Sequence, residues 1–165
     1  MILGMSTHLY THIHVAISLI AIATGLIVVL GMLANNALPG TTALFLITTA
    51  LTSVTGFFFP WKGFTPGIKL GIISLVVLCI TLIARNRRWR RTYIITAIIA
   101  LYLNVFVLVA QSFQKVPALK ALAPTQREPP FLIAQLVVMA LFVVLTIFAA
   151  KRFREEPASP RARAA

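Results

Sequence analysis

Acidic side chains are almost missing from this sequence of 165 residues. It contains no aspartate, and its three acids are Glu128, Glu155 and Glu156. All three lie outside the long apolar runs, so no carboxylate is available inside a helix that crosses a bilayer. Because coupled transporters usually carry their proton or cation relay on intramembrane carboxylates, the sequence argues against that class.

Cysteine is represented by Cys79 alone, which excludes an intrachain disulfide. Cys79 lies within an apolar run and has no base beside it in the sequence, so packing is its expected role. The chain also lacks the G-x-S-x-G elbow, the H-E-x-x-H zinc motif, the P-loop and paired catalytic carboxylates. These absences disfavour hydrolytic chemistry, and we predict no catalytic residue.

Apolar side chains make up 59% of the residues, and the mean hydropathy is +0.95. They occur in runs of about twenty, the length that a helix needs to cross roughly 30 Å of hydrocarbon. The sequence therefore predicts an all-α, polytopic transmembrane bundle, forming a single domain over residues 1–154, before a disordered basic cytoplasmic tail at 155–165. The five predicted spans cover residues 13–34, 41–59, 66–84, 92–113 and 131–150.

The formal net charge is +12, which in a soluble protein would suggest nucleic acid. Here the cations flank the apolar runs, so we predict the lipid bilayer as the partner and no nucleic acid. One side of the predicted topology carries five arginines at 85–91 and five cations in the tail, ten in all, against five on the other side. This excess predicts a cytoplasmic C-terminus and an N-terminus outside.

Small residues indicate where helices approach each other closely. The third span opens with Gly67-xxx-Gly71, and the first contains Ala21-xxx-Gly25. Small residues four positions apart allow two helix backbones to come into contact. These pairs favour packing within the chain over association between chains.

Polar side chains are unusually frequent within the predicted spans and mark the candidate site. Interhelical hydrogen bonding is one interpretation, because an unpaired amide in hydrocarbon costs several kcal/mol. The other is an outer-facing ligand pocket beneath the connection 114–130, which contains a predicted short helix at 117–123. The polar side chains cluster in the outer half of the predicted membrane domain, and this clustering favours the ligand pocket. The proposed ligand-binding residues are Thr48, Thr52, Thr55, Asn104, Gln111 and Gln135, with His14 at the rim.

The three histidines, His8, His12 and His14, provide an alternative candidate site, for a metal ion or haem. His8 and His12 are four residues apart, the spacing that places two ligands on one side of a helix. Imidazole suits zinc, copper and haem iron. All three come from one short stretch, so a haem site would need a methionine or a second subunit.

Several segments resemble a group of small, uncharacterised bacterial inner-membrane proteins. They are TTALFLITTALTSVTGFFFP at 41–60, LYLNVFVLVAQSF at 101–113 and KVPALKALAPTQ at 115–126. The resemblance covers most of the chain from His14 to about Arg154. It implies a multi-pass protein of the bacterial inner membrane and implies no mechanism.

The leading hypothesis is a non-enzymatic module that binds or passes a small polar or amphipathic molecule through the outer pocket. A haem- or metal-binding redox protein is one alternative. An accessory subunit of a larger membrane complex, or a homo-oligomer, is the other. The ligand and any cofactor are not identified by the sequence.

Overall fold

A computed structural model describes residues 2, 4–59 and 65–154. Among these residues the chain forms helices and no β-strand, which confirms the all-α prediction. The predicted tail at 155–165 lies outside the described residues. The helices are α1 (Thr7–Leu33), α2 (Pro39–Gly56), α3 (Pro66–Asn86), α4 (Arg90–Lys115), α5 (Pro117–Leu122) and α6 (Pro129–Arg152).

Helix starts and ends follow from local sequence. Proline occupies the first position of α2, α3, α5 and α6, where its missing N–H costs no hydrogen bond. Ser6 Oγ caps α1 by accepting from the Leu9 N–H at 3.2 Å. α1 ends where Asn35 adopts a φ of 54° and the Asn36 N–H donates to the Gly31 carbonyl at 2.8 Å. This left-handed residue turns the chain sharply toward α2.

Four helices, α1, α3, α4 and α6, are long and apolar enough to cross a membrane. The protein therefore has the character of a multi-pass membrane protein. α2 is not among the four, because seven of its 18 residues are serine or threonine. The fifth span and the orientation of the termini remain predictions.

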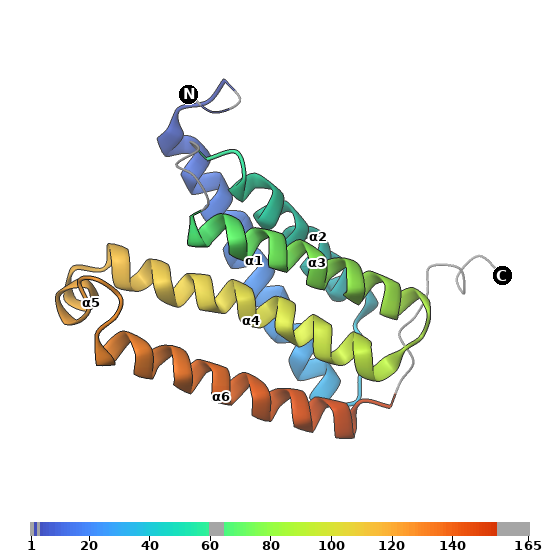
Figure 1. The fold of residues 1–165 in the computed structure, drawn as a ribbon. Coiled ribbons are helices and arrows are strands. Elements are labelled where there is room, and N and C mark those ends of the chain that lie inside the picture. The colour runs from blue at the N-terminus through green and yellow to red at the C-terminus, as the bar shows by residue number, and fades with distance from the viewer. Residues whose placement is uncertain (1, 3, 60–64, 155–165) are drawn as a thin grey trace.

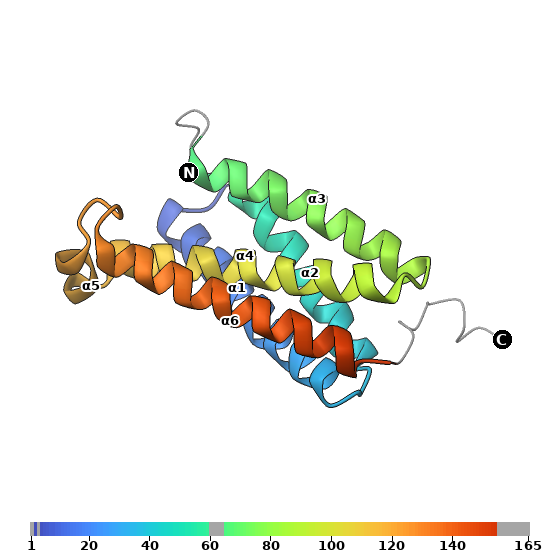
Figure 2. The same cartoon turned by 60° about the horizontal axis from the view of Figure 1, so that its bottom comes forward.

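The helices run between two opposite ends of the bundle. We call one the histidine end, where α1, α3 and α6 begin and α5 lies, and the other the arginine end, where α1, α3 and α6 finish. α4 lies between α3 and α6, and it also contacts α1 (Figures 1 and 2). α2 packs antiparallel to α1, and its last turn reaches Tyr10, whose hydroxyl donates to the Thr55 carbonyl at 2.8 Å.

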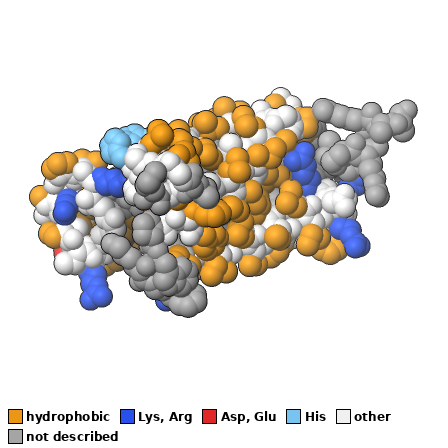
Figure 3. Space-filling view, turned by 90° about the horizontal axis from the view of Figure 1, so that it is seen from above, with side chains coloured by type: hydrophobic (Ala, Val, Ile, Leu, Met, Phe, Trp, Pro, Cys, Tyr) orange, Lys and Arg blue, Asp and Glu red, His pale blue; other side chains and the backbone are white. Residues whose placement is uncertain are grey.

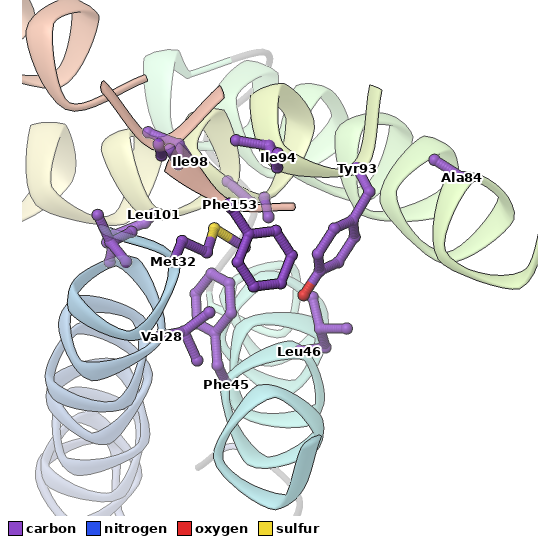
Figure 4. Packing of buried hydrophobic residues seen from close by; sticks show 14 of the residues in the cluster. Val28, Met32, Phe45, Leu46, Ala84, Tyr93, Ile94, Ile98, Leu101 and Phe153 are labelled. Carbon is purple, nitrogen blue, oxygen red and sulfur yellow. The ribbon is translucent and has the colours of Figure 1, made fainter. Parts of the chain in front are cut away.

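The main core lies toward the arginine end. The Phe153 ring, only 2% exposed, sits among Met32, Phe45 and Tyr93 from α1, α2 and α4 (Figure 4). The guanidinium of Arg90 donates to the Phe153 carbonyl and, at 3.3 Å, to the carbonyl of Ala150. These bonds satisfy carbonyls that the end of α6 leaves without helical partners, so the closure of the core and the capping of α6 are coupled.

The outer surface is apolar around its middle. In Figure 3, hydrophobic side chains cover the central part of the visible face, and Lys and Arg side chains gather at its two ends. Large apolar residues such as Leu30 and Val137 are exposed on the helices. A soluble protein rarely exposes apolar patches of this extent, whereas a bilayer solvates them.

Candidate functional site: a cavity at the histidine end

A cavity of about 530 Å³ lies near the histidine end, lined by residues of α1, α2, α3 and α4, some of which, such as Leu19 and Gln111, are exposed. α1 and α3 provide its opposite sides, while the last turns of α2 and the second half of α4 provide the rest. Gly56 and Gly71 line it, and the Phe57 ring packs closely against Gly71, where an added Cβ would lie 3.1 Å from Phe57 Cζ. The cavity therefore occupies the part of the bundle that the main core does not fill.

The cavity wall is mostly apolar and carries a limited set of hydrogen-bonding groups. Leucine, isoleucine and valine side chains come from α1, α3 and α4, and Phe57 and Phe59 from the segment that follows α2. Such a wall suits an alkyl or aromatic group, and the polar side chains suit a few oriented hydrogen bonds. The polar lining residues are Thr11, His14, Ser18, Thr52, Ser53, Thr65, Ser74, Asn104, Gln111, Ser112 and Lys115.

His14 is held at the cavity wall by the end of α2. Its Nδ1 lies 2.8 Å from Thr55 Oγ1, and its ring meets Phe59 edge to face at 5.2 Å. Thr55 already donates its hydroxyl hydrogen to the Leu51 carbonyl at 2.6 Å. Thr55 Oγ1 therefore accepts from His14 Nδ1–H, and in the neutral form of this ring Nε2 is the acceptor.

Asn104 combines the two roles that the sequence left open. It is only 8% exposed, and its Nδ2 donates to Thr49 Oγ1 at 3.2 Å, which joins α4 to α2. The same side chain also lines the cavity. Interhelical bonding and pocket lining are thus not exclusive, and one amide serves both.

Thr52 provides an unsatisfied polar atom beside the cavity. Its Oγ1 is buried and has no hydrogen-bond partner among the described residues, although the residue lines the cavity. Leaving a buried hydroxyl unpaired costs free energy, so such a group in a native structure calls for a partner. A polar atom of a bound molecule, or water, would provide one.

Four of the seven predicted ligand-binding residues meet at this cavity, namely His14, Thr52, Asn104 and Gln111. The other three lie outside its wall. Thr48 is buried and donates to the Leu44 carbonyl of its own helix at 2.7 Å. Thr55 supports His14 from behind, and Gln135 of α6 donates to the Phe106 carbonyl at 3.2 Å.

Lys115 is the charged lining residue that the sequence analysis did not assign to the site, and six lining serines and threonines were not assigned either. Lys115 was counted only as a charge beside a span. The pattern that identifies it is its spacing, because residues 104, 108, 111 and 115 fall on one stripe of a helix. All four line the cavity.

The connection 114–130 lies beside the cavity rather than over it. Its helix α5 is followed by Ala123, which packs with Phe113 and Phe131 in a small cluster between α4 and α6. Gln126 Nε2 fastens the connection by donating to the Ala110 carbonyl at 2.6 Å. Lys115 and Val116 are its contributions to the cavity wall, so the expected lid over the pocket is not observed.

The three histidines do not converge. The His8 and His12 rings lie 4.3 Å apart, and His12 Nδ1 is 2.8 Å from the His8 carbonyl oxygen. His14 instead turns toward Thr55. In the part of the chain that the structure describes, no group of three or more His, Cys, Asp or Glu side chains is placed to hold a metal. Metal or haem binding stays a prediction.

Comparisons of this chain with protein-family models, with curated proteins and with solved structures find no match.

Proposed function

We propose that the protein is a non-enzymatic integral membrane module that binds a small amphipathic molecule in the cavity between α1, α2, α3 and α4. The cavity itself is the observation that carries this proposal. Its volume of about 530 Å³ falls among small-molecule sites, which range over roughly 300–1,000 Å³. Its apolar wall suits a hydrocarbon group, and Asn104, Gln111 and Thr52 supply polar contacts.

The proposed topology has five spans, with α2 as the fifth and the N-terminus outside, in a bacterial inner membrane. Both α1 and α3 run from the histidine end to the arginine end, so a chain that crosses with both must cross back between them. α2 makes that return, and its side-chain hydroxyls donate to carbonyls one turn earlier, as Thr48 and Ser53 do. This bonding lowers the cost of placing a hydroxyl-rich helix in lipid.

Charge supports the same orientation. Among the described residues, eight Lys and Arg lie at the arginine end and four at the histidine end. The eight are Arg85, Arg87, Arg88, Arg90, Arg91, Lys151, Arg152 and Arg154, and the four are Lys69, Lys115, Lys120 and Arg127. An excess of this kind marks the cytoplasmic side, so the cavity is on the outer side.

The test uses an uncharged probe, a decyl glucoside that carries a photoreactive diazirine on its alkyl chain. The full chain is placed in phosphatidylcholine nanodiscs and labelled, and the labelled residues are identified by mass spectrometry. We expect labelling to concentrate on the cavity walls of α1, α3 and α4. Labelling spread evenly over lipid-facing residues such as Leu30 and Val137 would contradict the proposal.

A cavity-filling variant makes the same experiment specific. Ser18 lines the cavity, and its hydroxyl bonds only to the His14 carbonyl of its own helix at 2.7 Å. Ser18→Phe should therefore lower cavity labelling by about tenfold, since the added ring takes the space of the probe. Thr146→Phe on α6 is the control, because Thr146 makes a similar bond to the Phe142 carbonyl and lies outside the cavity. Equal labelling of the two variants would refute the proposal.

A further inference from the structure

The charge of the cavity wall has one sign. Lys115 is the only Lys, Arg, Asp or Glu among the lining residues that the structure describes. Glu128 is the one acid in the described part of the chain, and its carboxylate accepts from the Thr125 hydroxyl at 2.8 Å and from the Arg127 N–H at 3.0 Å. Glu128 does not line the cavity, so among the described lining residues no acid is paired with the positive charge of Lys115.

Helix dipoles do not cancel this charge. α1 and α3 begin at the histidine end and present their positive termini, whereas α2 and α4 finish there and present negative ones. Two opposite pairs offset each other at the part of the cavity nearest the histidine end, beside Lys115, which we call its mouth. The Lys115 ammonium remains as the net charge, and its long apolar stem allows the head to stay near the aqueous side.

The polarity of the cavity wall also changes along α4. Lys115 and Gln111 lie toward the mouth, and the wall continues inward through Leu108 and Val107 to Asn104. From residue 104 to residue 115 the helix rises roughly 17 Å, at 1.5 Å per residue. The mouth thus offers an ammonium and an amide, followed by an apolar stretch about as long as a medium alkyl chain.

We propose that the ligand is a single-chain amphiphile with an anionic head group, such as a carboxylate or a phosphate monoester. Lys115 and Gln111 hold the head at the mouth, and the alkyl chain lies inward between α1, α3 and α4. This inference rests on the proposed function and adds the charge and the orientation of the ligand. A cationic head would meet Lys115 with no acid to offset it, so the site discriminates by charge.

The experiment compares four compounds on the full chain in phosphatidylcholine nanodiscs, by equilibrium dialysis with empty nanodiscs subtracted. Decanoate, decyltrimethylammonium and decyl glucoside share a tail and differ in head charge, while acetate has the anionic head without the tail. We expect decanoate to bind at least tenfold more tightly than the cationic compound and more tightly than the glucoside. Acetate binding should be at least a hundredfold weaker, because the tail contributes most of the buried apolar area.

Matched variants assign the charge to one residue. Lys115→Gln should weaken decanoate binding by about tenfold or more, the scale of a charge-assisted hydrogen bond in a partly desolvated site, and Lys115→Arg should restore it. Lys120→Gln removes the same charge from α5 at the same end and does not touch the cavity wall, so it should have little effect.

Four results would overturn the inference. Equal losses in Lys115→Gln and Lys120→Gln would show that only the general surface potential matters. If decanoate and acetate bind equally tightly, the alkyl chain does not contribute to recognition. If decyl glucoside binds as tightly as decanoate, and equally to wild type and Lys115→Gln, the anionic head group is rejected while the cavity remains a ligand site. If none of the compounds binds, both proposals are rejected.

Discussion

Gly25 of α1 marks the closest approach between α1 and its neighbours, and its replacement by alanine tests the packing directly. A Cβ atom at Gly25 would lie 2.6 Å from Leu101 Cδ1, and 2.8 and 2.9 Å from Phe45 Cε2 and Cδ2. Leu101 is 0% exposed and Phe45 1%, so neither side chain can swing into open space. Distances below 3.0 Å require the neighbours to move, and α1, α2 and α4 all meet at this point.

The expected magnitude is the balance of two effects. Overpacking a well-packed core costs about 1–3 kcal/mol, and three contacts this short place Gly25→Ala near the upper value. The higher helix propensity of alanine offsets up to about 1 kcal/mol of this cost. We therefore expect Gly25→Ala to lower the free energy of unfolding by about 2 kcal/mol.

Gly56→Ala is the control for this experiment. Its Cβ would meet only His14 Cε1, at 3.8 Å, an ordinary contact, so the change should stay within about 0.5 kcal/mol. The assay is equilibrium unfolding in mild detergent with increasing dodecyl sulfate, followed by near-ultraviolet circular dichroism. If Gly25→Ala unfolds at the same denaturant fraction as wild type and Gly56→Ala, the three helices do not meet as described.

Three further predictions concern the core, pH and topology. Phe153→Ala should lower the free energy of unfolding by about 3 kcal/mol in the same assay, whereas Phe148→Ala, 49% exposed on α6, should cost under about 1 kcal/mol; similar losses would contradict the core assignment. Desolvation raises the pKa of Glu128, but hydrogen bonds from Thr125 and the neighbouring backbone outweigh it and lower that pKa below its usual 4.5. The ionised Glu128 therefore stabilises the fold at pH values above its unfolded-state pKa, and this stabilisation is lost as the pH falls through its folded-state pKa. A carboxyl NMR titration with a midpoint at or above 4.5 would reject this assignment. Single cysteines at Thr125 and Arg87, in a cysteine-free background, should react with an impermeant maleimide on intact spheroplasts at Thr125 only, and the reverse pattern would refute the proposed orientation.

Hydropathy located the helices well and their ends less well. The span predicted to start at residue 13 belongs to a helix that begins at Thr7, because the Ser6 cap and the polar turn Thr7–His12 extend it beyond the apolar run. Hydropathy reports which residues suit lipid, whereas capping decides where the helix starts. The second helix ends at Gly56, before the phenylalanines that were included in its predicted span. The short helix predicted at 117–123 is confirmed as Pro117–Leu122.

Site residues could be predicted where their position on one helix face was enough to identify them. They could not be predicted where the assignment depends on which helix packs against that face. Asn104 and Gln111 share a stripe of α4 and both line the cavity, Asn104 as a buried residue and Gln111 as an exposed one. Gln135 has the same chemistry but lies where α6 packs against the Phe106 turn of α4, and a sequence pattern does not state which helix is opposite. Lys115 was missed because a cation at the end of a span has a topological explanation that requires no pocket.

The closure of the main core by Phe153 has a consequence for biosynthesis. The ring fills the space between Met32, Phe45 and Tyr93, all of which are synthesised long before it. At about 5–20 residues per second, roughly 2–8 s pass between the synthesis of residue 115, where α4 ends, and that of residue 153. During that interval the first four helices have been made, but the carbonyl partners of Arg90 have not. The nascent chain therefore presents an open aromatic groove to lipid or to the insertion machinery, and a ribosome that stalls before Phe153 leaves a product that quality-control proteases can recognise.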